Sequence, residues 1–431
     1  MRSRTDSFLK QFLHKIQSFT KTVIFKNFGA LVLLQVGNTL LALLIMPYLI
    51  HVLGVGNFGL YSFALALSLY LVILTDYGFG FTGVKLISIN RDDRQKVSEI
   101  FHSIQIIKTV ILVLILALFT VCIFLIDSLA EHKKIYFVSF GVLIGQTIVP
   151  VWFFQGMERM KFITIINLII RTTAVVLIFI LVKTPEDVDL AIAAQAISFT
   201  AAGVLSIVLA YKEFNLKFVI PKYTQISELL VASRHMFFST LMLSLYKNFN
   251  VVLLGFLSTN VEVGIYAAAE RIVKAVQSLI APMSQAIYPN LSLKFSKLST
   301  QESVQNLKKI ATYYLIPLFG VVIGLVVFEG LIAQFLGMNE SGFTLVYYVL
   351  VPVIIFGSLN YLLGIVGLVN LNKEKWFQRA TIAGSLVNFG LCLGLSPKYG
   401  AIGSAIALSS AEFIVLAMVI GYLYKLSKFP K

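Results

Sequence analysis

Hydrophobic residues along this chain fall into long blocks that are separated by short polar segments. The blocks are roughly 20 residues long, which is the length that an α-helix needs to cross a membrane. Twelve such spans can be read from the pattern: 28–52, 58–84, 106–127, 135–156, 162–182, 189–211, 235–257, 262–290, 310–332, 343–370, 377–396 and 400–424. A membrane β-barrel would instead show alternation in short segments. The pattern therefore predicts an all-α polytopic membrane protein with about 12 transmembrane helices.

The overall composition supports this prediction. Of the 431 residues, 58% are hydrophobic and 13% are charged, and the mean hydropathy is +0.88. A soluble domain carries about a quarter of charged residues. The segments between the spans are too short to hold a catalytic domain outside the membrane. We therefore expect a membrane protein that is not an enzyme and has no catalytic residues.

The formal charge of +15 is distributed unevenly along the chain. The two termini and the loops that follow even-numbered spans hold 26 of the 35 Lys and Arg residues, whereas the opposite loops hold 4. Basic residues accumulate on the cytoplasmic side of membrane proteins. The excess charge therefore indicates cytoplasmic termini and attraction to anionic lipid, and it does not indicate binding to nucleic acid.

Weak internal repeats divide the chain into two halves. Gly59-Leu60-Tyr61 recurs as Gly264-Ile265-Tyr266, and LAIAAQA at 190–196 resembles AIGSAIA at 401–407. Six spans per half give both halves the same orientation, so they should be related by a pseudo-two-fold axis along the membrane normal. The predicted organisation places a six-helix bundle on each side of a linker, with terminal segments on the cytoplasmic side: 1–27, 28–211, 212–234, 235–424 and 425–431. The first segment has an amphipathic pattern that suits an interfacial helix, although a basic tail that only sets orientation explains it equally well.

The stretch TDYGFGFTG at 75–83 fits the spacing G-x-G-x-x-G through Gly78, Gly80 and Gly83. A dinucleotide site would require a preceding strand within a βαβ unit, and the pattern predicts none. No G-x-x-x-x-G-K-[ST] motif is present either, so transport driven by ATP on this chain is not expected. In a membrane span, glycines allow close helix packing or a break in the helix, and packing at a helix end is the more common explanation.

Three carboxylates within the spans are candidate functional residues. Asp76 lies above the cytoplasmic end of span 2, Glu270 lies in span 8, and Glu412 is near the middle of span 12. A carboxylate in a membrane costs about 2–3 kcal/mol unless it meets a partner or water, so these side chains should face the protein interior. They are candidates for coupling to a proton or sodium gradient or for gating. A static ion pair or helix-end hydrogen bond is the alternative for Asp76.

A group of cations is the strongest polar feature within the spans. Arg171 and Lys247 lie near the middle of spans 5 and 7, and Arg271 and Lys274 lie in the first half of span 8, three residues apart on one predicted helix face. Cations at these depths are expected to line a substrate path, and they suit a phosphate or an acidic sugar. Two alternatives remain: Glu270, four residues before Lys274, can neutralise it, and Arg171 can bind backbone carbonyls.

Cysteine and histidine predict no cofactor. Cys122 and Cys392 each lie inside a predicted span, and the histidines near span ends are not clustered with other ligands. We therefore expect no metal site, no disulfide framework and no cofactor apart from a coupling ion.

Two segments resemble a known family. They are IMPYLIHVLGVGNFGLYSFALALSLYLVILTDYGFGFTGVKLISINRDDRQKVSEIF at 45–101 and VPVWFFQGMERMKFITI at 149–165. Both are similar to the polysaccharide-transporter family of lipid-linked oligosaccharide flippases, the O-antigen or Wzx type, within the multidrug/oligosaccharidyl-lipid/polysaccharide exporter superfamily. The resemblance covers essentially the whole chain in length, span number and division into halves.

The resemblance implies two six-helix bundles that work by alternating access in the inner membrane of a bacterium. It implies a substrate of undecaprenyl pyrophosphate carrying an oligosaccharide repeat unit, used for O-antigen-like polysaccharide of lipopolysaccharide. It also implies a polysaccharide polymerase and a chain-length regulator as partners, and a cationic lumen that Lys247, Arg271 and Lys274 match. One departure is the turn after Asp76, where the family commonly has GFN and this chain has Gly80 followed by Phe81, so no role is carried over to Gly80.

Two other functions remain open at the level of sequence. A cation-coupled multidrug exporter of the same superfamily would be expected to have an acidic cavity, whereas the charges within these spans are net basic. A membrane-embedded glycan polymerase, ligase or acyltransferase would be expected to show a large outer loop or a catalytic cluster within the membrane. The leading hypothesis is therefore a flippase for a lipid-linked oligosaccharide.

Overall fold

A computed structural model of the protein describes residues 23–338 and 342–428. Side chains at 23–42, 243, 246–248 and 281–290 lie outside this description. Most of the predicted amphipathic segment 1–27 is likewise outside the described residues. Helices and short connections make up the described chain, which contains no β-strand, in agreement with the predicted all-α class.

The first half contains eight helical elements. They are α2 Val23–Asp76, α3 Phe79–Ile89, α4 Arg94–Leu125, α5 Asp127–Ala130, α6 Lys133–Ile148, α7 Val151–Gly156, α8 Met160–Leu181 and α9 Val188–Phe214. The predicted linker 212–234 is mostly helical, because α9 continues to Phe214 and the next helix begins at Tyr223. Only 215–222 lies outside helices between the two halves, and Asn215 ends α9 in the left-handed conformation.

The second half begins with a helix that is interrupted at Phe249, closer to its C-terminal end. Its elements are α10 Tyr223–Asn248, α11 Asn250–Leu257, α12 Asn260–Phe295, α13 Thr300–Val327, α14 Glu329–Leu336, α15 Phe343–Leu350, α16 Pro352–Leu359, the π-helix η1 Asn360–Val369 and α17 Glu374–Lys428. The predicted spans 7 and 10 are therefore built from α10–α11 and α15–α16–η1 rather than from single helices. A π-helical segment inside a span is uncommon and often accompanies a functional site.

Two helices are too long to cross a membrane once. At about 1.5 Å per residue, the 54 residues of α2 and the 55 residues of α17 would each exceed twice the hydrocarbon thickness. Each is broken at a glycine with positive φ, 78° at Gly54 and 55° at Gly400. A left-handed conformation favours glycine, so each long helix contains two of the predicted spans joined at that residue.

Within the described residues, 8 helices are long and apolar enough to cross a membrane. Two of these, the described part of α2 and α17, extend across the breaks at Gly54 and Gly400. The interrupted α10–α11 segment and the charged helix α12 are not among the eight. The difference from the 12 predicted spans therefore comes from merged helices and from polar or interrupted ones.

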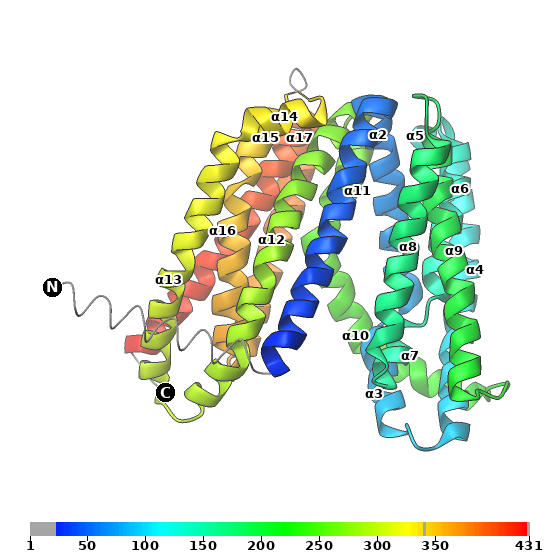
Figure 1. Ribbon diagram of the computed structural model, residues 1–431, viewed down its shortest axis with the longest axis horizontal. Helices are drawn as coiled ribbons and strands as arrows, with labels where there is room; N and C mark the ends of the chain where they lie inside the picture. The colour runs from blue at the N-terminus through cyan, green and yellow to red at the C-terminus, as the bar shows by residue number, and fades with distance from the viewer. Residues whose placement is uncertain (1–22, 339–341, 429–431) are drawn as a thin grey trace.

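The two halves lie side by side and meet at one end (Figure 1). At the upper end of this view α12 packs along α2, and one buried hydrophobic core continues through that contact from Phe58 and Tyr61 to Val263 and Tyr266. Towards the lower end the two groups of helices diverge. There α10 contacts α3 and α4 of the first half and α17 of the second half.

Candidate functional site

The contact between the halves is made by equivalent positions of the internal repeat. A Cβ atom added at Gly59 would lie 1.7 Å from the carbonyl oxygen of Asn260, and one added at Gly264 would lie 2.2 Å from the carbonyl oxygen of Val55. Because both glycines lack a side chain, the two backbones approach as closely as in small-residue helix contacts of other membrane proteins. The reciprocal pairing is what a pseudo-two-fold axis between the halves requires.

Arg271 lies on α12 two turns after this contact and points at the first half. Its guanidinium carbon is 5.0 Å from the ring centroid of Phe58, and its Nη2 atom donates a hydrogen bond to Ser62 Oγ at 3.2 Å. Tyr61, whose ring is 6.0 Å from the guanidinium, accepts a hydrogen bond from Gln195 of α9. A cation above aromatic rings is stabilised by their negative faces, so Arg271 joins the halves just below their closest approach.

Lys274 has different surroundings from Arg271, although both were predicted to share one helix face. Its Nζ atom is 3.0 Å from Glu270 Oε1, so the expected pair between these residues is present. Glu270 is 5% exposed and also accepts a hydrogen bond from the hydroxyl of Tyr266 at 3.2 Å. Lys274 and Glu270 therefore face the interior of the second half, whereas Arg271 faces the first half.

Buried polar side chains continue from Glu270 into the core of the second half. Asn250, the first residue of α11, donates to the hydroxyl of Tyr266 at 3.1 Å and to the carbonyl oxygen of Ser404 at 3.3 Å. Its own side-chain oxygen accepts from Asn388 at 2.9 Å. These bonds connect Glu270 to the interruption between α10 and α11, since buried polar groups require such partners.

A cavity of about 540 Å³ lies within the second half and brings together three of the predicted residues. Glu270 and Lys274 reach it from α12, and Glu412 reaches it from α17. Glu412 Oε2 accepts a hydrogen bond from Asn360 Nδ2 at 2.7 Å, at the start of the π-helix η1. The sequence alone did not indicate this cavity, because it depends on side chains from helices that are far apart in the chain.

Two further cations were predicted to line the substrate path. Arg171 lies on α8 in the first half, and its side chain is exposed. Lys247 is the second-last residue of α10, and its side chain lies outside the described residues. Its backbone lies two residues before the break at Phe249, so Lys247 belongs to an interrupted membrane helix of the kind that forms binding sites in other transporters.

Asp76 is the last residue of α2 and has two partners. Its Oδ1 atom is 3.2 Å from Lys108 Nζ of α4, and its Oδ2 atom accepts a hydrogen bond from the backbone nitrogen of Gly80. The side chain of Lys108 is 4% exposed and that of Asp76 is 32% exposed. Lys108 lies within the predicted span 106–127, but the sequence did not pair it with Asp76, so the partner of this carboxylate was missed.

The glycines after Asp76 break span 2, which was predicted to continue from 58 to 84. Tyr77 and Gly78 both have positive φ, and α3 begins at Phe79 with a new direction. A Cβ atom added at Gly78 would lie 2.6 Å from the backbone nitrogen of Phe237 on α10. The motif therefore ends a helix and allows α10 to approach the first half, and no strand precedes it within the described chain.

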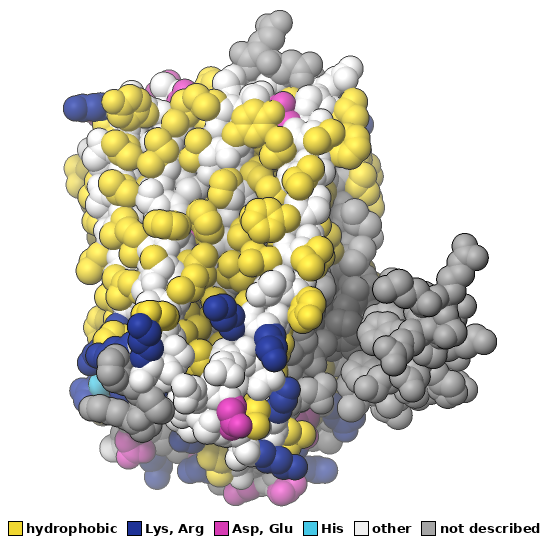
Figure 2. All heavy atoms as spheres, turned by 90° about the vertical axis from the view of Figure 1, so that its left-hand side faces the viewer, with side chains coloured by type: hydrophobic (Ala, Val, Ile, Leu, Met, Phe, Trp, Pro, Cys, Tyr) yellow, Lys and Arg dark blue, Asp and Glu magenta, His cyan; other side chains and the backbone are white. Residues whose placement is uncertain are grey.

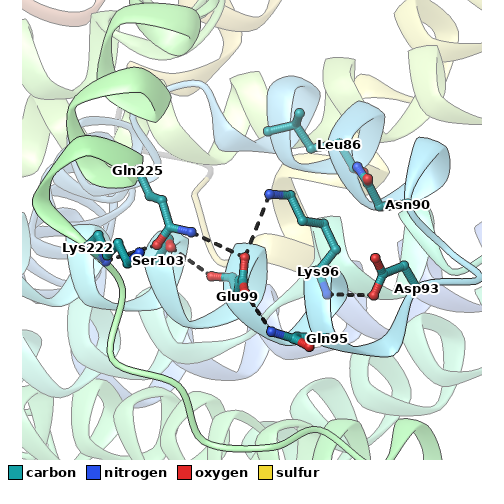
Figure 3. Close-up of polar contacts among 9 residues, drawn as sticks. All are labelled: Leu86, Asn90, Asp93, Gln95, Lys96, Glu99, Ser103, Lys222 and Gln225. Carbon is teal, nitrogen blue, oxygen red and sulfur yellow. Dashed lines mark hydrogen bonds and ion pairs between the residues drawn. The ribbon is translucent and has the colours of Figure 1, made fainter.

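A polar cluster at the lower end of the first half holds the start of α10 (Figure 3). Glu99 of α4 accepts a hydrogen bond from Gln225 Nε2 at 3.2 Å and is 3.7 Å from Lys96 Nζ. Gln225 in turn accepts from the backbone nitrogen of Lys222 at 2.9 Å. The connection 215–222 and the first turn of α10 are thus attached to the first half, although α10 leads into the second.

Comparison with other proteins identifies the family. Residues 24–295 match the family described as polysaccharide biosynthesis protein, which is more than half of the chain. This protein belongs to that family. The membership confirms the resemblance found in the sequence. This member of the family is a multi-pass membrane protein with two six-helix halves.

Curated relatives of this family member are similar over nearly their whole length. A putative O-antigen transporter of Escherichia coli (strain K12) is 31% identical over 398 residues, which are 92% of this chain and 95% of the relative. A putative O-antigen transporter of Shigella dysenteriae is 30% identical over 402 residues, with 92% and 98% covered. A probable flippase of Haloferax volcanii, AglR, is 24% identical over 420 residues, with 94% and 82% covered.

Solved structures share the fold of this family member. The lipid II flippase MurJ in an inward closed conformation has a TM-score of 0.67 and 14% identity, with 94% of this chain and 90% of that chain covered. A multidrug resistance MATE family transporter of the MOP superfamily, in an inward-facing conformation, has a TM-score of 0.65 and 14% identity, with 93% and 100% covered. At these identities the likeness concerns the two-lobed, 12-helix transporter fold.

Proposed function

We propose that this protein is a flippase, which moves an undecaprenyl-pyrophosphate-linked oligosaccharide from the cytoplasmic to the outer leaflet of a bacterial inner membrane. The observation that carries the proposal is the near-full-length similarity to putative O-antigen transporters, together with family membership. The transported repeat units serve the synthesis of an O-antigen-like surface polysaccharide. A polysaccharide polymerase and a chain-length regulator are the proposed protein partners on the outer side.

The proposed orientation places both termini in the cytoplasm. The uneven distribution of Lys and Arg supports it, because basic loops remain on the cytoplasmic side. Figure 2 supports it as well: hydrophobic side chains cover most of the upper part of the second half, and most of the Lys and Arg side chains on this face gather near the lower end. In this orientation the halves meet at the outer side and diverge towards the cytoplasm.

The proposed mechanism is alternating access around the contact between the halves. Lys247, Arg271, Lys274 and Arg171 bind the pyrophosphate or acidic groups of the substrate, while the polyprenyl chain stays in the bilayer. Arg271 is the cation whose contacts would change most when the two halves move apart, because its partners Phe58 and Ser62 belong to the other half. Separation of Gly59 from Gly264 would release Arg271 from these partners and open the outer side.

The energy source in this proposal is a proton or sodium gradient. Three carboxylates are available to bind the coupling ion, and each has a different partner: Asp76 pairs with Lys108, Glu270 pairs with Lys274, and Glu412 accepts from Asn360. Binding of a proton or sodium ion to a carboxylate weakens its existing ion pair, which can shift the balance between two conformations. Export measured at fixed membrane potential, with the proton and sodium gradients removed in turn, tests this part of the proposal.

A complementation experiment tests the proposed function. In a bacterium that lacks its own copy of this gene, the wild-type protein should restore surface polysaccharide, and the combined change Lys247→Gln and Arg271→Gln should abolish it while the protein remains inserted. The matched control Lys398→Gln removes an exposed cation of α17, two residues before the break at Gly400, and should restore polysaccharide normally. Normal surface polysaccharide in the strain without the gene would refute the flippase assignment, and normal polysaccharide in the double variant would refute the cationic site.

A further inference from the structure

The lower end of α17 carries a group of cations outside the proposed substrate path. Because α17 is broken at Gly400, its first and last turns lie at the same end of the molecule (Figure 1). Five cations lie in or next to these turns, together with one carboxylate, Glu374: Lys373, Lys375, Arg379, Lys425 and Lys428. Among the residues that the structure describes, none of the five cations has an ion-pair partner. This end of α17 is therefore a strongly basic surface.

Aromatic rings join the two ends of α17 and support one of these cations. The rings of Trp376 and Tyr422 stack with their centroids 4.3 Å apart. The guanidinium carbon of Arg379 is 5.2 Å from the centroid of the Trp376 ring. A cation over an aromatic ring is stabilised by the negative face of the ring. Because this contact uses the charge of Arg379 rather than its N–H groups, those donors are available to a second partner.

These side chains lie at the depth of a membrane interface. Arg379 precedes the break at Gly400 by 21 residues, and Tyr422 follows it by 22 residues. At about 1.5 Å per residue, each stretch covers roughly 30 Å, which is the thickness of the hydrocarbon core. Trp and Tyr concentrate at the boundary between this core and the lipid headgroups. The basic surface therefore lies at the level of the headgroups.

Exposed apolar side chains continue one face of α17 from these cations towards the membrane centre. Lys375, Arg379, Ile382, Leu386 and Leu393 are spaced by four, three, four and seven residues, which places them on one helix face. All five are exposed, and the two charged residues come first. The side of the second half seen in Figure 2 shows the same order, with hydrophobic side chains above and most Lys and Arg side chains near the lower end. A phospholipid has the matching polarity, with a charged headgroup followed by apolar chains.

We propose that this surface binds an anionic phospholipid such as phosphatidylglycerol. Arg379 donates to the phosphate oxygens, because a guanidinium offers two parallel N–H donors to such a group. Lys375 and Lys425 add attraction to the negative charge, and the acyl chains pack along Ile382 and Leu386. A zwitterionic lipid binds more weakly, since its own cation is repelled by the lysines. The inference requires a protein that spans a membrane, and it does not depend on which substrate is transported.

The fluorescence of Trp376 can report on lipid at this surface. The chain has two tryptophans, of which Trp152 is buried and Trp376 is 36% exposed. Full-length Trp152→Phe protein is placed in phosphatidylcholine bilayers in which brominated phosphatidylcholine or brominated phosphatidylglycerol replaces part of the lipid. Bromine quenches tryptophan on contact, so the quenching gives a relative binding constant for each lipid. Phosphatidylglycerol should bind about fivefold more tightly, which is the contribution of one Lys or Arg near an anionic headgroup. Should Trp152→Phe fail to fold, the wild-type protein gives the same comparison over a constant signal from buried Trp152.

Variants of the cations assign the preference to this surface. Arg379→Gln combined with Lys425→Gln should bring the ratio of the two binding constants close to one. Arg379→Lys should keep part of the preference, because it retains the charge and loses the two-donor geometry. The matched control is Lys212→Gln combined with Lys217→Gln, which removes two exposed lysines at the lower end of the first half and should keep the full preference.

Equal quenching by the two brominated lipids would overturn the inference. An unchanged preference after Arg379→Gln and Lys425→Gln would overturn it too, and so would an equal loss in the control, because the attraction would then be a property of the overall charge. Reversal of the quenching by an excess of inorganic phosphate would also overturn it, since the ligand would then be free phosphate rather than lipid. None of these outcomes bears on the flippase function, which the complementation experiment tests separately.

Discussion

The helix that follows Gly59 in the first half and the helix that follows Gly264 in the second can be compared position by position. Both glycines allow backbone contact with the opposite half, and Tyr61 and Tyr266, two residues later in each case, are both buried. The hydroxyl of Tyr61 accepts a hydrogen bond from Gln195, a neutral residue of its own half. The hydroxyl of Tyr266 donates instead to the carboxylate of Glu270.

The two helices then differ completely in charge. After Tyr61 the helix continues with uncharged residues as far as Asp76, whereas after Tyr266 it carries Glu270, Arg271 and Lys274 within two turns. The shared part of the repeat forms the contact between the halves, and the unshared part carries the ionisable groups. The repeated positions therefore build the contact between the halves, and the ionisable groups lie at positions where the two halves differ.

The largest effect is expected from changing the shared glycines. Gly59→Ala and Gly264→Ala each place a Cβ atom within 2.2 Å of backbone in the opposite half, which cannot be relieved by a side-chain rotation. Overpacking of this kind costs about 1–3 kcal/mol, and each variant should lose most surface polysaccharide. Thermal unfolding of the purified proteins and complementation measure both effects.

The control for these variants is Gly324→Ala, since Gly324 has open space around it. If only one of the two contact glycines proved sensitive, the symmetric contact between the halves would be contradicted.

The next largest effect is a difference in stability between variants of the ion pairs Asp76–Lys108 and Glu270–Lys274. Asp76→Asn leaves the ammonium group of Lys108, which is 4% exposed, without its charged partner, whereas Glu270→Gln leaves Lys274, which is 39% exposed, close to water. The charge that remains is buried in the first variant and partly exposed in the second. A buried polar group left without its partner costs about 1–3 kcal/mol, whereas the loss of a partner to a partly exposed charge costs about 1 kcal/mol or less. We therefore expect Asp76→Asn to lower the unfolding temperature more than Glu270→Gln.

The double variant Asp76→Asn with Lys108→Met serves as the control for this comparison. It should recover part of the lost stability, because no buried charge remains. Equal destabilisation by the two single variants would contradict the difference in burial.

A smaller effect is expected at the cluster that holds α10 to the first half. Glu99→Gln removes the charged acceptor for Gln225 and Lys96, which should cost about 1 kcal/mol. The connection 215–222 should then be cleaved faster by a protease added to the purified protein. Gln95→Ala is a suitable control, because its 3.4 Å contact with Glu99 lies on the same helix and does not reach α10. Unchanged cleavage in Glu99→Gln would show that the cluster does not hold the connection.

The smallest effect concerns the start of α13. Ser299 and Glu302 form a reciprocal cap, and the hydrogen bonds from Ser299 lower the pKa of Glu302 below its usual range. A lowered pKa in the folded state means that the carboxylate stabilises the protein above the ordinary value of about 4.3 and that this contribution is lost as pH falls through the lowered pKa. The unfolding temperature of Glu302→Gln should therefore be slightly below that of the wild type at neutral pH, and the gap should close in acid. A gap that widens in acid would contradict the cap.

Local patterns in the sequence predicted much of the fold. Residue periodicity located the spans, and the four-residue spacing of Glu270 and Lys274 anticipated an ion pair that the structure contains. The repeat at Gly59 and Gly264 predicted two similar halves. These features depend on neighbours along one helix or on the length of a hydrophobic block, so a single sequence is enough to find them.

Contacts between distant helices could not be predicted in the same way. Nothing in the sequence pairs Asp76 with Lys108 or Arg271 with Phe58, because these partners lie on separate helices whose packing is not encoded by periodicity. The cavity around Glu412 was missed for the same reason. The break at Tyr77 and Gly78 had a visible signal in the glycines, but packing at a helix end was the expected explanation.

The break at Gly54 has a mechanical consequence. Gly54, a single residue with positive φ, separates the N-terminal segment of α2, which ends before it, from the C-terminal segment, which follows it. The two segments are therefore joined with no flexible loop between them. The C-terminal segment packs against α12 at Gly59. In the N-terminal segment, His51 lies against Gly337 at the end of α14, where an added Cβ atom would be 3.1 Å from Nε2 of His51. Because both segments contact the second half, a movement of that half would displace both of them together. The N-terminal segment can bend at Pro47, because proline removes one backbone hydrogen bond of the helix.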